Sequence, residues 1–195
     1  MPLDAVIFDF DGVVIDSHSA HERSWFMLAA EIQKTLTSEE FTRTFGQRNE
    51  TILPLLGWAD EGDHLRIKEL GDRKEVLYRE ILAQEGIVAL PGVVALLENL
   101  KAAGIPTAVG TSAQRKNIEC AFGLLGISHL FQDVAASEDV TKGKRVTLML
   151  IHADDVVAER AGNRLRQLTD FERVCGLLEF RDEASFSAFA QIAAL

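Results

Sequence analysis

Residues 5–17 read Ala-Val-Ile-Phe-Asp-Phe-Asp-Gly-Val-Val-Ile-Asp-Ser, and this stretch decides the fold of the chain. Its first four residues are apolar and predict a buried strand, which runs directly into Asp9 and Asp11. Because side chains alternate along an extended segment, the two carboxylates are expected near one mouth, with Phe10 on the other face. Gly12 then allows a sharp turn.

Two carboxylates at the end of a buried strand are unfavourable unless they are paired, hydrated or bound to a metal. They would repel each other, and Mg²⁺ would relieve that repulsion while using the hard oxygen ligands it prefers. An aspartate can also attack phosphoryl groups as a nucleophile, and a second aspartate can act as general acid and base. The alternative interpretation is a strand end followed by an Asp-Gly turn without chemistry.

Residues 9–17, Asp-Phe-Asp-Gly-Val-Val-Ile-Asp-Ser, closely resemble the first motif of the haloacid dehalogenase-like (HAD) superfamily. More narrowly, they look like the branch that holds β-phosphoglucomutases and small sugar-phosphate or phosphoglycolate phosphatases. The resemblance implies that Asp9 is the nucleophile and Asp11 the general acid/base, with Gly12 among the phosphate-binding residues. It also implies a Mg²⁺ cofactor on the Asp9 carboxylate and the Asp11 backbone carbonyl.

The composition of the 195 residues is that of a globular protein, with 47% hydrophobic residues and a formal net charge of −10. That length and content suffice for one full core with a small appended domain. The negative charge argues against a nucleic-acid partner, which needs a basic face. No signal-peptide pattern, membrane-spanning apolar run, disulfide framework or zinc motif is visible, so we expect a cytoplasmic protein.

Apolar residues recur at helical spacing from about residue 16 to residue 87, which predicts a wholly helical block whose first helix covers residues 18–34. After it, segments 93–103 and 114–125 are predicted helices, and segments 105–110 and 131–136 are predicted strands. This alternation is typical of a parallel sheet covered on both faces by helices, and such sheets bind ligands at the carboxyl ends of their strands.

The predicted fold class is therefore α/β, a Rossmann-like parallel sheet flanked by helices with an inserted all-helical cap. We expect residues 1–15 and 88–195 to form the core and residues 16–87 to form the cap above the crevice. The resemblance agrees, because that branch carries a helical cap at this position.

Thr111 and Ser112 end a predicted strand and precede a helix, where a hydroxyl and free backbone N–H groups suit a phosphate. The alternative is that they only cap the helix. In the resembling family a Ser or Thr here is the second motif and binds phosphate. The third motif contains a lysine that neutralises the phosphate and the nucleophile; Lys144 matches it, and Lys142 is the nearby competitor.

The predicted cap also contains residues that resemble substrate contacts. His21 and Trp25 match residues of the first cap helix in β-phosphoglucomutase-like proteins, and Arg48 lies in a loop like the one that meets substrate. Lys74 and Tyr78 match a pair on a later cap helix. Arg48 is the best candidate for a distal phosphate, because a guanidinium binds phosphate in a bidentate way. The alternatives are core packing for Trp25, a solvated face for Lys74 and a helix surface for His21.

The resemblance covers residues 3–144 and then fails, because no proline follows Lys144 and the expected helix is missing. The core from residue 145 to residue 195 is therefore atypical. Segment 146–151 is a predicted strand, and the two aspartates after it are the preferred replacement for the acidic fourth motif that holds the metal. The candidates for that ligand are Asp154, Asp155, Asp170 and Asp182.

These residues predict a Mg²⁺-dependent phosphatase that acts on a small phosphorylated metabolite through an aspartyl-phosphate. A phosphomutase of the β-phosphoglucomutase type is the runner-up, supported by the matching cap residues. A HAD-like binding protein without activity is the alternative from another class, because the fourth motif is not recognisable. A dehalogenase fits poorly, since it has no need of Asp11. The substrate and the oligomeric state are left open.

Overall fold

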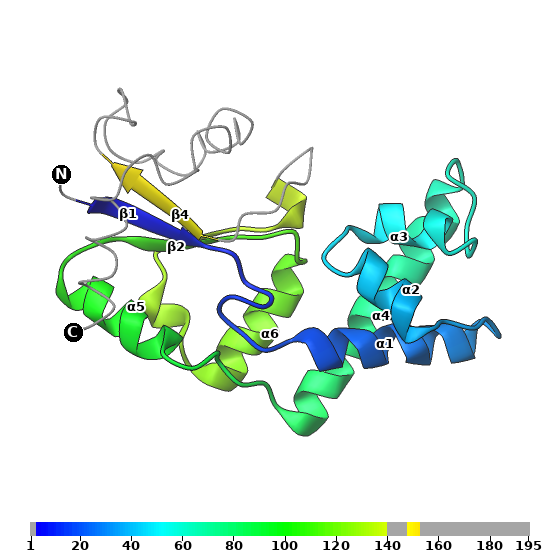
Figure 1. Cartoon of the computed structure of the whole chain (residues 1–195), viewed down its shortest axis with the longest axis horizontal. Coiled ribbons are helices and arrows are strands. Elements are labelled where there is room, and N and C mark those ends of the chain that lie inside the picture. Colours follow the sequence, from blue (N-terminus) through cyan, green and yellow to red (C-terminus); the bar gives the residue numbers. More distant parts are fainter. Residues whose placement is uncertain (1–2, 140–147, 153–195) are drawn as a thin grey trace.

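The computed structural model describes residues 3–139 and 148–152, and the statements below concern that part of the chain. Its strands form one sheet in the order β3-β2-β1-β4, with the helices α1–α4 standing off one end of it (Figure 1). The strands are β1 (Leu3–Phe8), β2 (Thr107–Gly110), β3 (Asp133–Ala135) and β4 (Leu148–His152).

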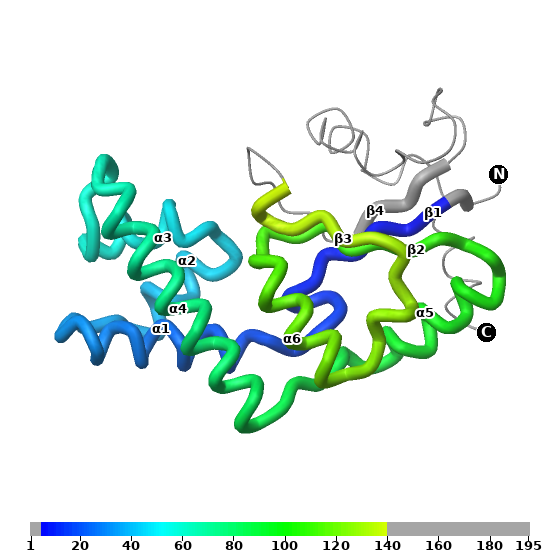
Figure 2. The backbone as a smooth tube through the Cα atoms, turned by 180° about the vertical axis from the view of Figure 1, so that it is seen from behind, coloured from blue at the N-terminus to red at the C-terminus, as the bar shows by residue number. Residues whose placement is uncertain are grey.

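The first three strands are parallel, as the βαβ pattern predicts. Phe8 of β1 lies opposite Val109 of β2, which in turn lies opposite Val134 of β3, so all three strands end at one edge. The helices α5 (Val93–Ala102) and α6 (Arg115–Leu125) connect them and lie together on one face of the sheet (Figures 1 and 2). The residues that follow β1 and β2 therefore meet at the same place.

Strand β4 departs from the expected parallel arrangement, because it pairs with β1 in the antiparallel sense. Only residues 140–147 separate it from the short helix η2 (Ser137–Asp139), and a parallel crossover needs a dozen or more residues. Leu148 pairs with Phe8 and His152 with Leu3, so β4 ends at the far end of β1 from Asp9. This corrects the expectation that the strand ends at the mouth of the site; the candidate ligands Asp154, Asp155, Asp170 and Asp182 lie outside the described residues.

The cap is all-helical, as predicted, and its four helices pack around the pair α1 and α4. Thr37 begins α2 with a capping box: its hydroxyl accepts from the backbone N–H of Glu40, whose carboxylate accepts from the backbone N–H of Thr37. The first helix ends at Glu31, three residues before the predicted end at residue 34, and Gln33 shortly after it adopts a positive φ of 54°. The helices are α1 (His18–Glu31), α2 (Ser38–Thr44), α3 (Asn49–Leu55) and α4 (His64–Glu85).

Helix α4 joins the cap to the α/β core, because its buried residues belong to two hydrophobic clusters. Leu70 and Leu77 pack in the cap cluster with Trp25, whereas Ile81 and Leu82 pack in the core cluster. The two connections between the parts also pair with each other: the backbone N–H of Asp16 donates to Val88, and that of Leu90 donates to Val14. Both features hold the cap over the carboxyl end of β1.

Candidate active site

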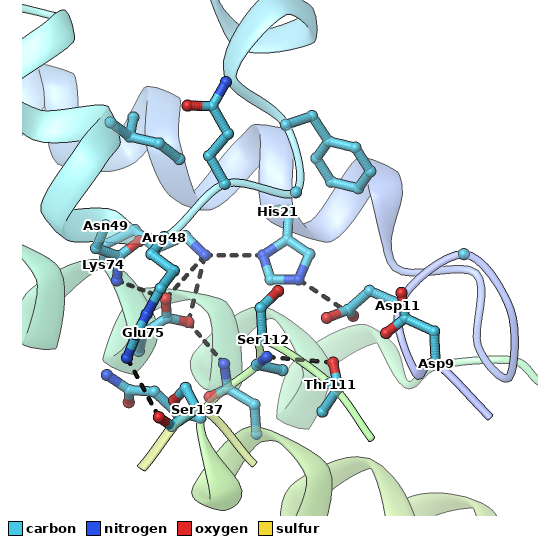
Figure 3. A pocket seen from close by; sticks show the side chains of 18 of the residues that line it. Asp9, Asp11, His21, Arg48, Asn49, Lys74, Glu75, Thr111, Ser112 and Ser137 are labelled. Carbon is cyan, nitrogen blue, oxygen red and sulfur yellow. Dashed lines mark hydrogen bonds and ion pairs between the residues drawn. The ribbon is translucent and has the colours of Figure 1, made fainter. Parts of the chain in front are cut away.

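A cavity of about 310 Å³ lies between the carboxyl ends of β1 and β2 and the cap helices (Figure 3). Residues from the core and from three cap elements line it, so the predicted crevice exists and the cap covers it. Lys144, with its competitor Lys142, lies outside the described residues. Tyr78 is buried in the core cluster and is not among the lining residues. The cavity is lined by the other predicted site residues: Asp9, Asp11, Gly12, His21, Trp25, Arg48, Lys74, Thr111 and Ser112.

Asp9 and Asp11 follow β1 directly and line the cavity, and the chain turns immediately after them. Asp9 Oδ1 accepts from the backbone N–H of Phe10 at 2.7 Å, while the Phe10 ring is buried in the core on the other side. Gly12 makes the turn possible with a φ of 74°. Burial acts to raise the pKa of the Asp11 carboxyl, but the neighbouring His21 ring and the Lys74 ammonium hold it below its ordinary value.

His21 lies between Asp11 and Lys74 and stacks on Tyr78, with ring centroids 4.0 Å apart. Its Nδ1 is 2.8 Å from Lys74 Nζ, and its Nε2 is 3.3 Å from Asp11 Oδ1. Because an ammonium group only donates hydrogen bonds, Nδ1 accepts from Lys74, and this network assigns the ring proton to Nε2, where it faces Asp11. The alternative of a helix-surface histidine is wrong, since the side chain is 12% exposed.

Lys74 is buried, with 3% of its surface exposed, so the alternative of a solvated lysine is wrong. Its Nζ lies 5.6 Å from the ring centroid of Trp25 and 5.4 Å from that of Tyr78, which adds cation–π attraction. Trp25 packs in the cap core, as its alternative interpretation held, and also lines the cavity. Burial, together with the charges of Asp11 and Glu75, raises the pKa of Tyr78, which keeps its hydroxyl neutral.

Sequence reasoning missed Glu75, which is 6% exposed and lies within 3.3 Å of the Lys74 ammonium. It also missed Asn49 and Asn117, whose side-chain amides donate to the two oxygens of Glu75. Burial acts to raise the pKa of Glu75, but the Lys74 charge and these donors hold it below its ordinary value. The only sequence signal for Glu75 was its position directly after Lys74. Asn117 lies 42 residues from Glu75 in the chain, and no sequence signal connected the two.

Thr111 and Ser112 follow β2 at the floor of the cavity (Figure 3). Thr111 is 7% exposed, and its hydroxyl accepts from the backbone N–H of Ala113 at 3.2 Å. The residue before α6 is Gln114, which makes no side-chain capping bond, so neither Thr111 nor Ser112 caps this helix. The capping alternative is therefore wrong, and both residues line the same cavity as Asp9 and Asp11.

Arg48 precedes α3 on the cap side of the cavity and reaches down to the core (Figure 3). Its guanidinium donates to the backbone carbonyl of Ser137 at 3.2 Å and lies 3.7 Å from the Glu50 carboxylate. These two contacts hold the positive charge at the rim of the cavity opposite the two aspartates. The polar side chains of Gln47 and Gln114 also line the cavity.

The residues that could hold a metal are oxygen ligands. In residues 3–139 and 148–152 no cluster of three or more His, Cys, Asp or Glu side chains has the arrangement of a metal site. By themselves, Asp9 and Asp11 offer two carboxylates and the Asp11 backbone carbonyl, which are oxygen ligands of the hard type that Mg²⁺ prefers. Within the same part of the chain, no helix is long and apolar enough to cross a membrane.

The sequence model of the haloacid dehalogenase-like hydrolase family matches residues 3–161 of this chain. The chain belongs to the haloacid dehalogenase-like hydrolase family. Among solved structures, a β-phosphoglucomutase from Clostridium difficile superposes on this HAD chain with a TM-score of 0.63 at 22% identity. The superposition covers 73% of this chain and 66% of that protein, and it supports the fold.

Two curated relatives of this HAD chain are named as phosphatases. The 5-amino-6-(5-phospho-D-ribitylamino)uracil phosphatase of the Arabidopsis thaliana chloroplast is 31% identical over 161 residues, which are 79% of this chain and 42% of that protein. Hexitol phosphatase A of Escherichia coli is 37% identical over 106 residues, which are 54% of this chain and 47% of that protein. The chain therefore spans less than half the length of either relative.

Proposed function

We propose that this chain is a Mg²⁺-dependent phosphatase of small phosphorylated carbohydrates that works through an aspartyl-phosphate on Asp9. The observation that carries the proposal is the meeting of Asp9 and Asp11 with Thr111 and Ser112 in one cavity under a helical cap. The names of the two relatives support the substrate class, because a ribityl phosphate and a hexitol phosphate are both phosphate esters of acyclic polyols.

In the proposed reaction, an Asp9 carboxylate oxygen attacks the substrate phosphorus and the bond to the ester oxygen breaks. Asp11 gives its proton to the leaving alkoxide, which departs as the free alcohol. Asp11 then removes a proton from water, whose oxygen attacks the phosphorus of the aspartyl-phosphate. Inorganic phosphate leaves, and Asp9 and Asp11 return to their starting states.

Asp11 must carry a proton to act first as an acid, although His21 and Lys74 favour its ionised form. A phosphate dianion beside Asp11 acts in the opposite direction, because a nearby negative charge raises the pKa of a carboxyl group. Substrate binding thus supplies the change in charge that the acid step needs.

Thr111 and Ser112 would hold the phosphoryl oxygens through their hydroxyl and backbone N–H groups, beside Gly12, and Lys144 is proposed to add a positive charge there. The Asp9 carboxylate and the Asp11 backbone carbonyl would hold Mg²⁺, which when bound supplies charge neutralisation for the transferring phosphoryl group. Arg48 lies across the cavity from this end and would bind the distal part of the substrate.

The test measures phosphate release from p-nitrophenyl phosphate, hexitol and pentitol phosphates and glucose 6-phosphate, with Mg²⁺ or with EDTA. We expect Mg²⁺-dependent release that favours the polyol phosphates and disappears in Asp9→Asn. Conversion of glucose 1-phosphate to glucose 6-phosphate would instead support the mutase. A folded protein that releases no phosphate from any of these compounds would refute the enzyme and favour the binding protein.

A further inference from the structure

Glu75 lines the cavity and joins the cap to the core by hydrogen bonds. Its Oε1 accepts from the side-chain amide of Asn49 on α3 at 2.8 Å, and its Oε2 accepts from that of Asn117 on α6 at 2.6 Å. The Lys74 ammonium lies 3.2 and 3.3 Å from the two oxygens. One carboxylate therefore engages α3, α4 and the core helix α6 at once.

Asn117 fits this position because its amide has both a donor and an acceptor. Its nitrogen donates to Glu75, while its oxygen accepts from the Arg79 guanidinium at 2.7 Å, and the side chain is 2% exposed. Glu75 and Arg79 are one turn apart on α4, so the amide receives two successive contacts from the same helix face. A carboxylate at position 117 would satisfy Arg79 but would repel Glu75.

The contacts continue from Glu75 to the general acid. Glu75 fixes the Lys74 ammonium, which donates to Nδ1 of His21, and this bond leaves Nε2–H facing Asp11. Without the Glu75 charge, the buried Lys74 loses its one carboxylate partner within hydrogen-bonding distance among the described residues. Its ammonium would then turn toward the cavity and release the His21 ring.

We propose that Glu75 is a positioning residue for this site: held by Asn117 of the core, it sets Lys74 and thereby the His21 tautomer that orients Asp11. The link from Asp11 to turnover rests on the proposed function, whereas the effect on His21 does not. A cap seated on the core through Asn117 thus completes the acid–base group, and a displaced cap leaves it incomplete.

The experiment compares Glu75→Gln, Asn117→Asp and the double variant Glu75→Gln/Asn117→Asp with the wild type. The double variant exchanges the carboxylate and the amide, so it restores a hydrogen bond between the two positions while removing the charge from position 75. Glu80→Gln is the matched control, because it removes an exposed carboxylate from the same helix. Each protein is examined by thermal unfolding, kinetics of phosphate release and long-range ¹H–¹⁵N spectra of the histidine rings, with His21 assigned from His21→Gln.

In the wild type and in Glu80→Gln, we expect the His21 spectrum of a ring protonated at Nε2. In Glu75→Gln we expect the two nitrogen signals to converge, as in a ring that exchanges tautomers, and kcat to fall about tenfold to a hundredfold with little change in KM. The double variant should regain thermal stability over the single variants but neither the wild-type kcat nor the His21 spectrum.

An unchanged His21 spectrum in Glu75→Gln would overturn the proposal, and so would a double variant that recovers kcat together with stability. A rise in KM at constant kcat would make Glu75 a substrate contact instead. Because the spectra need no turnover, an inactive wild type with the expected His21 tautomer would count against the proposed function alone. If Glu75→Gln does not fold, Asn117→Ala keeps both charges and should shift the His21 spectrum in the same direction by a smaller amount.

Discussion

Replacing Lys74 by methionine should destabilise the protein far more than its small change in volume suggests. The methionine side chain would retain most of the apolar stem, so the main loss is the ammonium group of Lys74, which is 3% exposed and contacts Glu75 and His21. Removing one member of a buried ion pair costs about 3–5 kcal/mol, because the other charge stays buried. Asn49 and Asn117 still donate to Glu75, so we expect a loss near the lower limit, about 3 kcal/mol.

Urea unfolding at pH 7 measures this loss, provided that the slope of the transition stays constant. The matched control is Lys68→Met on the same helix, where the side chain is 73% exposed and the expected change is about 0.5 kcal/mol or less. The double variant Lys74→Met/Glu75→Gln removes both charges and should recover at least half of the loss. Two results would refute the buried ion pair. One is a Lys74→Met variant as stable as Lys68→Met. The other is a double variant whose loss in free energy of unfolding exceeds the sum of the losses in Lys74→Met and Glu75→Gln.

Three further results are expected. Thr111→Val should lower kcat/KM for phosphate release by about tenfold to a hundredfold, since one hydrogen bond to a charged group is worth about 1.5–3 kcal/mol, and an unchanged value would exclude a phosphate contact. Leu77→Ala in the cap cluster should lower the free energy of unfolding by about 2–5 kcal/mol, whereas Leu65→Ala, at an 84% exposed position, should change it by less than about 0.5 kcal/mol. The pKa of Glu75 lies below its ordinary value of 4.5, so its contribution to stability is present above pH 4.5 and lost as pH falls through the lowered pKa. Glu75→Gln should therefore unfold with a weaker dependence on pH below 4.5, and parallel curves for both proteins would contradict this.

The sequence was sufficient for those parts of the fold that depend on local pattern. Apolar runs located β1 and β2, and helical spacing located the cap. The common carboxyl edge of parallel strands then brought Asp9 and Thr111 to one cavity, although they are far apart in the chain. These predictions succeeded because each depends on periodicity or strand direction.

Other features depend on contacts between distant residues and could not be obtained in this way. The antiparallel direction of β4 follows from the short connection before it. The pattern of an apolar strand followed by carboxylates carries no information on strand direction. The bonds from Glu75 to Asn49 and Asn117 depend on how three helices pack. For Lys74 and His21 the sequence left open an exposed position, because a polar residue on a helix is usually solvated. Their burial depends on partner groups that lie far away in the sequence.

The central claim, that Asp9 is the nucleophile, is tested most directly by trapping the phosphorylated protein. The wild type is mixed with Mg²⁺ and a rapidly hydrolysed polyol phosphate, quenched in acid during turnover, and its phosphorylated peptide is identified by mass spectrometry. We predict a hydroxylamine-sensitive acyl phosphate on the peptide that contains Asp9, absent from Asp9→Asn. A phosphoryl group on a different side chain, or turnover that persists in Asp9→Asn, would contradict the account.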